Sequence, residues 1–298
     1  MKAYGVEQVK AIIQKQYHDF KIHQIIKVGE GKDCTAFEIN NDYIFKFPKH
    51  TRASDSLINE ISVLRYLKGK LPIPIPQVVL TGCACDDFAM SFVGYSKIFG
   101  TPLRPDLLRN LSHESQEQVA IDLARFLKAL HSIEVKDLNK NLIIDYRKKI
   151  EDDHKKIKSI ITGQIIKEQH EKVDGFYREL LDKDQYFCYK PCLIHNDFSS
   201  DHILYDVSKD RICGIIDFGD AAISDPDNDF MNLIEEDEEY GLEFGLKVLN
   251  NYDHPDIPLV LEKYKMKEKY WSFEKILYGK EYGYIDWYKE GMNEIKNI

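Results

Sequence analysis

The spacing of hydrophobic residues separates a strand-rich first third of the chain from a largely helical remainder. Residues 4–17 carry apolar side chains at helical spacing, and residues 22–39 alternate as strands do. The following segment has period two, which places Phe45 and Phe47 on one face of a strand and Lys46 on the other.

A helix is expected after this strand and should end near residue 68. Residues 71–76 contain three prolines, so this segment must be extended rather than helical. Short apolar runs at residues 78–80 and 90–93 predict two further strands, joined by a turn over residues 82–87.

The remainder of the chain shows helical periodicity. One core-facing stripe is formed by Val119, Leu123, Phe126 and Leu130. Residues 142–182 are highly charged and carry only a thin seam of isoleucines. Acidic and basic residues interleave there, which favours a solvated pair of helices over a nucleic-acid surface.

These patterns predict an α+β fold with two domains. Residues 1–95 would form a small lobe built on an antiparallel sheet. Residues 96–298 would form a larger, mostly helical lobe, with a helical insertion at about residues 142–182. A chain of 298 residues is long enough to bury a sizeable core.

Composition and charge narrow the possible partners. The formal net charge of −9 disfavours nucleic acid and suits a cationic small molecule, although a modest acidic balance also serves solubility. The sequence has no apolar run of about 18 residues and no N-terminal signal core, so we expect a cytoplasmic protein without a membrane span. We also expect a monomer, although the sequence itself carries no signal for oligomeric state.

The cysteines do not indicate a metal site. They stand at positions 34, 83, 85, 188, 192 and 213, without the paired spacing of a zinc site. In a cytoplasmic chain they are expected to be reduced thiols.

Candidate chemistry lies in two polar loops that follow short apolar runs near residues 193–194 and 212–216. The first loop carries Asp197 and His202, and the second begins at Asp217. If the two runs form adjacent antiparallel strands, these side chains meet at one cavity. Phosphoryl transfer needs a carboxylate to orient the attacking hydroxyl and oxygen ligands to hold a metal. Any single aspartate could merely begin a turn, but the combination favours a catalytic site.

A second constellation lies in the strand-rich part. Glu60 falls in line with the apolar stripe of its predicted helix, so its carboxylate faces inward and needs a partner. Lys46 is the natural partner. Gly29 and Gly31 would let a backbone turn lie close to a phosphate, although Gly-x-Gly is more often only a hairpin turn.

The sequences His195-Asn196-Asp197 and Asp217-Phe218-Gly219 resemble the catalytic and metal-binding loops of the protein-kinase-like fold. The continuation through Asn228-Asp229-Phe230 and the segment 123–131 resemble the aminoglycoside phosphotransferases, and the 2″-phosphotransferase branch is similar over nearly the whole chain. This resemblance implies a two-lobed kinase-like fold. It also implies transfer of the γ-phosphate of ATP or GTP to an aminoglycoside 2″-hydroxyl, with Mg²⁺ as cofactor, conferring resistance to the antibiotic.

The resemblance also implies roles for individual residues. Asp197 would orient the substrate hydroxyl and Asp217 would bind magnesium. The Lys46–Glu60 pair would position the phosphates. Backbone groups of Ser96 and Ile98 would face the nucleotide base.

His202 departs from the kinase pattern, which generally has Asn at this position. Either His202 binds the metal, which would favour softer ions such as manganese, or it has yielded that role to water and Asp217. His195 is expected to support the loop rather than carry a proton.

Carboxylates crowd the segment after Gly219. They are Asp220, Asp225, Asp227, Asp229, Glu235, Glu236, Asp237, Glu238 and Glu239. A solvated helix face would account for them, but so would the lining of a site for a polycation.

Five acidic residues and two tryptophans are the substrate-binding candidates. In a helix from about Phe230, the carboxylates of Glu235, Glu238 and Glu239 would share a face. With Asp220 and Asp197 they would contact the aminoglycoside. Trp271 and Trp287 could pack on its sugar rings or be ordinary core aromatics.

Two alternatives remain open. A choline- or ethanolamine-kinase-like enzyme of the same fold would bind a single cationic nitrogen, for which an aromatic cage would suffice. A non-catalytic nucleotide-binding module is the other. The sequence does not distinguish ATP from GTP as donor.

Overall fold

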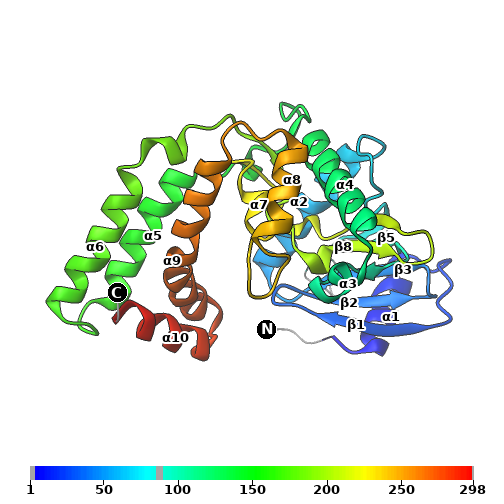
Figure 1. The fold of residues 1–298 in the computed structure, drawn as a ribbon. Coiled ribbons are helices and arrows are strands. Elements are labelled where there is room, and N and C mark those ends of the chain that lie inside the picture. Colours follow the sequence, from blue (N-terminus) through cyan, green and yellow to red (C-terminus); the bar gives the residue numbers. More distant parts are fainter. Residues whose placement is uncertain (1–3, 85–89, 297–298) are drawn as a thin grey trace. The chain divides into compact units, whose positions relative to one another are not determined.

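The computed structural model describes residues 4–84 and 90–296 and forms two compact units (Figure 1). The first unit comprises Met1–Leu142, Leu193–Ala222 and Asn228–Asp253, and the second comprises Ile143–Cys192, Ile223–Asp227 and His254–Ile298. Part of the turn predicted over residues 82–87, and Cys85, lie outside the described residues. The other five cysteines are free thiols.

A five-stranded antiparallel sheet forms the N-terminal part of the first unit, with strand order β1-β2-β3-β5-β4. Its strands are β1 (Ile25–Glu30), β2 (Cys34–Ile39), β3 (Tyr43–Pro48), β4 (Val78–Gly82) and β5 (Phe92–Ser96). The predicted alternation of faces along β3 is confirmed, because Phe45 and Phe47 are fully buried on one face. Lys46 therefore points to the opposite face.

Each face of this sheet is covered by a helix. α1 (Val6–Gln16) buries Val9, Ile12 and Ile13 in one apolar cluster with Phe45 and Phe47. α2 (Thr51–Leu67) lies on the other side, where Glu60 meets Lys46. The sheet thus keeps an apolar face for its core and offers a polar one to the site.

The rest of the first unit is mainly helical. Its helices are α3 (Pro105–Asn110), α4 (His113–His131), α7 (Asn228–Met231) and α8 (Leu242–Tyr252), with a short 3₁₀ turn at Lys140–Leu142. The predicted apolar stripe of α4 is buried, and α4 packs against α8.

A three-stranded antiparallel sheet of order β6-β8-β9 carries the loops. It contains β6 (Thr101–Pro102), β8 (Ile203–Asp206) and β9 (Arg211–Ile215), while β7 (Cys192–Ile194) and β10 (Ala222–Ser224) lie outside it. We expected the strand before the first loop to pair with β9, and this was wrong. The partner of β9 is β8, the strand after that loop, so His202 and Asp217 flank a paired hairpin.

The second unit is a helical bundle. Its helices are α5 (Tyr146–Ile161), α6 (Lys167–Leu181), α9 (Ile257–Tyr282) and α10 (Ile285–Lys296), with a 3₁₀ turn at Asp184–Phe187. Helices α5 and α6 occupy the charged segment predicted to be helical, and Ile150, Ile157 and Ile161 of its seam are buried in the bundle core. The seam keeps the pair together while the charges stay in water.

The compact units do not divide the chain at residue 95. Strand β5 continues to Ser96, and the first unit also includes the loops around Asp197 and Asp217. The division into lobes 1–95 and 96–298 therefore stays a prediction.

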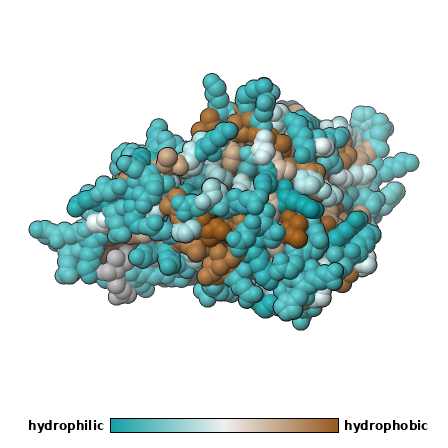
Figure 2. Space-filling view, turned by 45° about the horizontal axis from the view of Figure 1, so that its top comes forward, coloured by the Kyte–Doolittle hydropathy of each residue, from teal (hydrophilic) through white to brown (hydrophobic). Residues whose placement is uncertain are grey.

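The face of the molecule seen in Figure 2 is mostly hydrophilic, with separate hydrophobic groups. Over the described residues, every helix is too short or too polar to cross a bilayer.

The aromatic core of the sheet gives a stability prediction. Phe47 is fully buried and stacks on Phe92 with ring centroids 5.0 Å apart. We expect Phe47→Ala to lower the free energy of unfolding by about 3–5 kcal/mol, because it leaves a cavity. Urea unfolding followed by circular dichroism measures this. The control Ile58→Ala, at a position 50% exposed on α2, should change it by less than about 0.5 kcal/mol. Similar losses for both variants would contradict the prediction.

Candidate active site

One largely buried lysine, Lys46, joins three elements at the polar face of the sheet. The Nζ of Lys46 donates to both carboxylate oxygens of Glu60, at 3.1 and 3.3 Å, and to Oδ1 of Asp217 at 2.8 Å. Glu60 is only 2% exposed. The predicted Lys46–Glu60 pair is therefore formed, and it includes Asp217 as a third member.

Charge sharing sets the protonation of this cluster. Burial alone would lower the pKa of Lys46, but the charges of Asp217 and Glu60 raise it. Burial would raise the pKa of Asp217, yet the ammonium of Lys46 holds it well below its usual range. Burial raises the pKa of Glu60, and Asp217 opposes its ionisation further. Asp217 is thus the carboxylate that stays charged.

The first loop is a tight turn held by its own backbone. The carbonyl oxygen of Asp197 accepts the N–H of Ser199 at 3.0 Å, and the N–H of His202 donates to the Ser199 carbonyl at 3.1 Å. Asn196 and Asp217 both have positive φ, 65° and 66°, which a short polar side chain tolerates best. The side chain of Asn196 donates to the Asp220 carbonyl at 3.1 Å and links the two loops.

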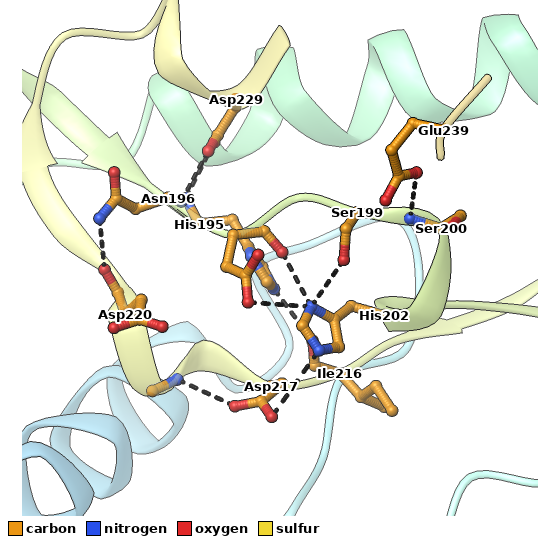
Figure 3. A network of polar contacts seen from close by, with 12 residues as sticks. His195, Asn196, Ser199, Ser200, His202, Ile216, Asp217, Asp220, Asp229 and Glu239 are labelled. Atoms are coloured by element: carbon orange, nitrogen blue, oxygen red, sulfur yellow. Dashed lines mark hydrogen bonds and ion pairs between the residues drawn. The ribbon is translucent and has the colours of Figure 1, made fainter. Parts of the chain in front are cut away.

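The ring of His202 lies between the two catalytic candidates, as Figure 3 shows for its approach to Asp217. Its Nδ1 is 2.9 Å from the carbonyl oxygen of Asp197 and 3.5 Å from the carboxylate of the same residue. A nitrogen next to a carbonyl must donate, so the neutral ring carries its proton on Nδ1. Nε2 is then an acceptor, 3.8 Å from Oδ2 of Asp217.

These two groups fit a divalent cation. The lone pair of Nε2 and the ionised carboxylate of Asp217 are close enough to share one ion, and the bond from Nδ1–H to a backbone carbonyl is the usual support for a ligating histidine. Within residues 4–84 and 90–296, no three His, Cys, Asp or Glu side chains converge to hold a metal. Further ligands would come from phosphate oxygens and water, as is typical for magnesium.

Asp229 holds the start of this loop, a role that the sequence did not predict. Asp229 is fully buried, and its carboxylate accepts the N–H of His195 at 2.8 Å and of Asn196 at 2.7 Å. His131 Nε2 lies 3.1 Å from the same carboxylate, and His131 Nδ1 lies 3.0 Å from the hydroxyl of Tyr252.

His195 has the supporting role expected of it. Its ring is buried, and Nε2 donates to the Ile216 carbonyl at 3.0 Å. Burial lowers the pKa of His195, which keeps the ring neutral. The signal for Asp229 in the sequence was its place in Asn228-Asp229-Phe230, where we counted it only among the crowded carboxylates.

The acidic segment is not the predicted helix. Helix α7 ends at Met231, and the oxygens of Glu235 accept the N–H groups of Asp237, Glu238 and Glu239 at 2.8–2.9 Å. The side chain competes for the N–H groups that a helix would use, so the chain turns instead. The prediction that Glu235, Glu238 and Glu239 share one face of a helix was therefore wrong.

The crowded carboxylates have different surroundings. Asp225 and Asp227 lie in the second unit, buried against Lys263 Nζ at 2.7 and 2.6 Å, so they are not part of an open lining. Asp220 is exposed beside the loops. Although Asp220 keeps a solvent-exposed surface, the surrounding protein partly desolvates its carboxyl group, and this together with the charges of Asp197 and Asp217 raises its pKa to about 6.

The nucleotide-binding candidates lie in the first unit. The N–H of Gly31 donates to the Cys34 carbonyl at 3.0 Å, and Gly29 pairs with Ala36 in the sheet, so this turn closes a hairpin. The N–H of Ser96 donates to the Gln77 carbonyl at 2.9 Å and is not available to a base.

The remaining candidates are Ile98 in the first unit and two tryptophans in the second. The side chain of Ile98 packs over Gly214. Trp271 and Trp287 lie in the second unit, 40% and 41% exposed, with ring centroids 5.7 Å apart. They are thus not core residues, and their contact with a sugar stays a prediction.

The support by Asp229 gives a second stability prediction. Asp229→Ala removes the acceptor of one buried and one partly buried backbone N–H group and of the His131 contact, so the free energy of unfolding should fall by about 3–5 kcal/mol. Urea denaturation measures it. Asp19→Ala, at an exposed aspartate, is the matched control and should stay within about 0.5 kcal/mol of the parent. An Asp229→Ala protein as stable as this control would show that the bonds contribute nothing.

Comparison with known proteins agrees with this geometry. The chain matches the phosphotransferase enzyme family over residues 25–260. The structure of APH(2″)-IIa with gentamicin is 31% identical, covers 99% of this chain and 97% of that one, and superposes with a TM-score of 0.88. ADP-bound aminoglycoside phosphotransferase APH(2″)-Ib is 30% identical over 95% and 97% of the two chains, with a TM-score of 0.84. A GDP and kanamycin complex of APH(2″)-IIIa is 28% identical over 97% of each, with a TM-score of 0.85.

The α+β kinase-like fold implied by the sequence motifs is confirmed by these matches. This chain therefore belongs to the phosphotransferase enzyme family, as an enzyme of kinase type whose structural relatives include 2″-aminoglycoside phosphotransferases.

Proposed function

We propose that this protein transfers the γ-phosphate of ATP or GTP to the 2″-hydroxyl of an aminoglycoside and thereby confers resistance to it. The observation that carries the proposal is the convergence of Lys46, Asp217, His202 and Asp197 in one unit. Support for the substrate comes from relatives of nearly equal length whose complexes hold gentamicin or kanamycin, and for the donor from those that hold ADP or GDP.

The proposed roles follow from the distances. Lys46, fixed by Glu60, would present its ammonium to the phosphates of the donor. Asp197 would accept a hydrogen bond from the substrate hydroxyl and align it on the γ-phosphate, because its carboxylate is part-exposed and faces the metal-binding candidates. Gly29, Gly31 and the backbone through Ser96 and Ile98 would contact the nucleotide, apart from the Ser96 N–H, which is bonded to Gln77.

We propose magnesium as the cofactor, held by His202 Nε2 and Asp217, and we expect manganese to replace it well because one ligand is an imidazole nitrogen. When bound, it would neutralise the charge on the phosphates during transfer. The fixed tautomer of His202 supports the first of the two hypotheses for this residue, that it is a direct ligand.

We propose that the acidic residues near Asp197 recognise the several ammonium groups of the drug. Asp220 and Glu238 are exposed in the first unit and can face a ligand. Glu235 and Glu239 are candidates too, although their carboxylates already accept backbone N–H groups. Trp271 and Trp287 would pack on the sugars. A choline-like substrate has one cationic nitrogen and would use few of these charges.

We propose a cytoplasmic location, because the proposed donor is a nucleotide. We also propose a monomer, in which all the catalytic groups come from one chain.

The test is nucleotide consumption with and without an acceptor. Kanamycin or gentamicin should stimulate turnover of ATP or GTP, and NMR of the product should place the phosphate on the 2″-oxygen. Asp197→Asn should reduce the stimulated kcat by at least about 10²-fold while nucleotide affinity stays within about twofold, because it removes the hydroxyl acceptor and not the phosphate contacts. Stimulation by choline alone would favour the single-amine alternative, and an unstimulated background a non-catalytic module.

Asp220 gives a pH prediction. Desolvation, Asp197, Asp217 and Asp33 raise its pKa to about 6, and Lys32 opposes the shift. As the pH rises through about 6, Asp220 loses its proton and adds a negative charge, so kanamycin should bind about three- to tenfold more tightly at pH 7 than at pH 5. Calorimetric titration of the nucleotide-free protein measures this. Asp220→Asn should flatten the profile between these pH values, and an unchanged profile would exclude Asp220 as the titrating group.

A further inference from the structure

A hydrogen bond from outside the first loop supports the middle of that loop, which runs from His195 to His202. The carboxylate of Glu239 accepts the backbone N–H of Ser200 at 2.9 Å, and Figure 3 shows this bond beside the His202 ring. Ser200 is buried and begins the 3₁₀ turn Ser200–His202 that carries His202. The bond therefore lies on the backbone between Asp197 and His202.

Glu239 is itself held on both sides in the sequence. Its N–H donates to the carboxylate of Glu235 at 2.9 Å. The next residue, Tyr240, donates its hydroxyl to the Leu103 carbonyl at 2.6 Å, just after strand β6. This strand pairs with β8, so the acidic segment and the hairpin that follows His202 share one support.

The hydrogen bonds within the loop do not use the N–H of Ser200. Within the turn, Ser199 and His202 use their N–H groups on the carbonyls of Asp197 and Ser199, and His202 Nδ1 uses Asp197 again. The N–H of Ser200 points out of the turn to Glu239. Without this acceptor, a buried donor would be unpaired and the turn could relax.

We propose that Glu239 is a positioning residue, which holds the Ser200 turn so that Asp197 and His202 keep their mutual geometry. It would act through the backbone, so Glu239 would leave the set of acidic candidates that contact the aminoglycoside. The inference deepens the proposed function and rests on it only for the kinetic readout with an antibiotic.

Two substitutions separate positioning from recognition of a cation. Glu239→Ala removes the acceptor and should lower kcat about tenfold while KM for kanamycin stays within about twofold. Glu239→Gln keeps an amide oxygen that can accept the Ser200 N–H, so kcat should return to within about twofold of the parent. If Glu239 instead binds an ammonium group, both variants raise KM and kcat is unchanged, which would overturn the proposal. Asp237→Ala, at an exposed carboxylate of the same segment, is the matched control and should change neither constant.

A second variant tests the bond from its other end. Ser200→Pro removes the N–H donor together with the Ser200 hydroxyl, which also hydrogen-bonds to Glu239. Proline suits this position because it is the first residue of the turn and Ser199 before it is extended, with φ −111° and ψ 167°. In this background Glu239→Ala should cost no further activity. A full additional tenfold loss would mean that Glu239 acts elsewhere and would contradict the proposal.

A readout independent of the antibiotic completes the test. Amide hydrogen exchange of the Ser200 N–H in the parent and in Glu239→Ala should show faster exchange in the variant, with Glu239→Gln near the parent. Slow nucleotide hydrolysis without acceptor should fall in parallel with kcat. If no aminoglycoside is phosphorylated, the proposed function fails, while unchanged exchange and hydrolysis in Glu239→Ala would separately refute the positioning role.

Discussion

The ion cluster around Lys46 is the constraint on which the site depends. It joins a strand and a helix of the sheet region to a loop 171 positions further along the chain. Withdrawing a lysine from water is costly unless partners replace its hydration, and here two carboxylates do so. One ammonium between two carboxylates leaves surplus negative charge, which explains why the pKa values of Glu60 and Asp217 move in opposite directions. The lysine is thereby fixed, and the loop carboxylate kept ionised, by contacts within the protein alone.

The acidic residues that follow illustrate how one residue type serves different purposes. Asp229 accepts backbone donors deep in the first unit, and Asp225 and Asp227 neutralise a buried lysine in the second. Glu235 organises the turn that contains it. Only carboxylates exposed to solvent, such as Asp220, keep free capacity for a cation. Electrostatic attraction of a polycation therefore depends on fewer groups than the composition of the segment suggests.

Much of this fold could be predicted from local patterns, because the patterns report burial. Period-two alternation gave the inward phenylalanines of β3 and left Lys46 opposite them, and helical spacing placed Glu60 inward. The motifs placed Asp197 and Asp217 in loops.

The predictions that failed depended on competition for hydrogen bonds or on partners distant in the sequence. The helix after Phe230 was lost because a glutamate side chain captured the backbone donors, and the contact of His131 with Asp229 joins residues 98 positions apart, for which no local signal exists. Strand pairing failed likewise, since a pattern identifies a strand but not its neighbour.

The loop that carries Asp197 and His202 shows why these distant contacts matter for the proposed chemistry. His202 Nδ1 is bonded to the carbonyl of Asp197, the residue that would orient the hydroxyl. The same ring places its other nitrogen, Nε2, toward Asp217. A shift at one position is therefore passed to the other within five residues. Such a short loop cannot fix its own orientation, because its internal bonds move with it. Asp229 anchors its start and Glu239 its middle, and both come from the segment that follows the Asp-Phe-Gly motif. That segment thus acts as the scaffold of the loop, whatever its exposed charges bind.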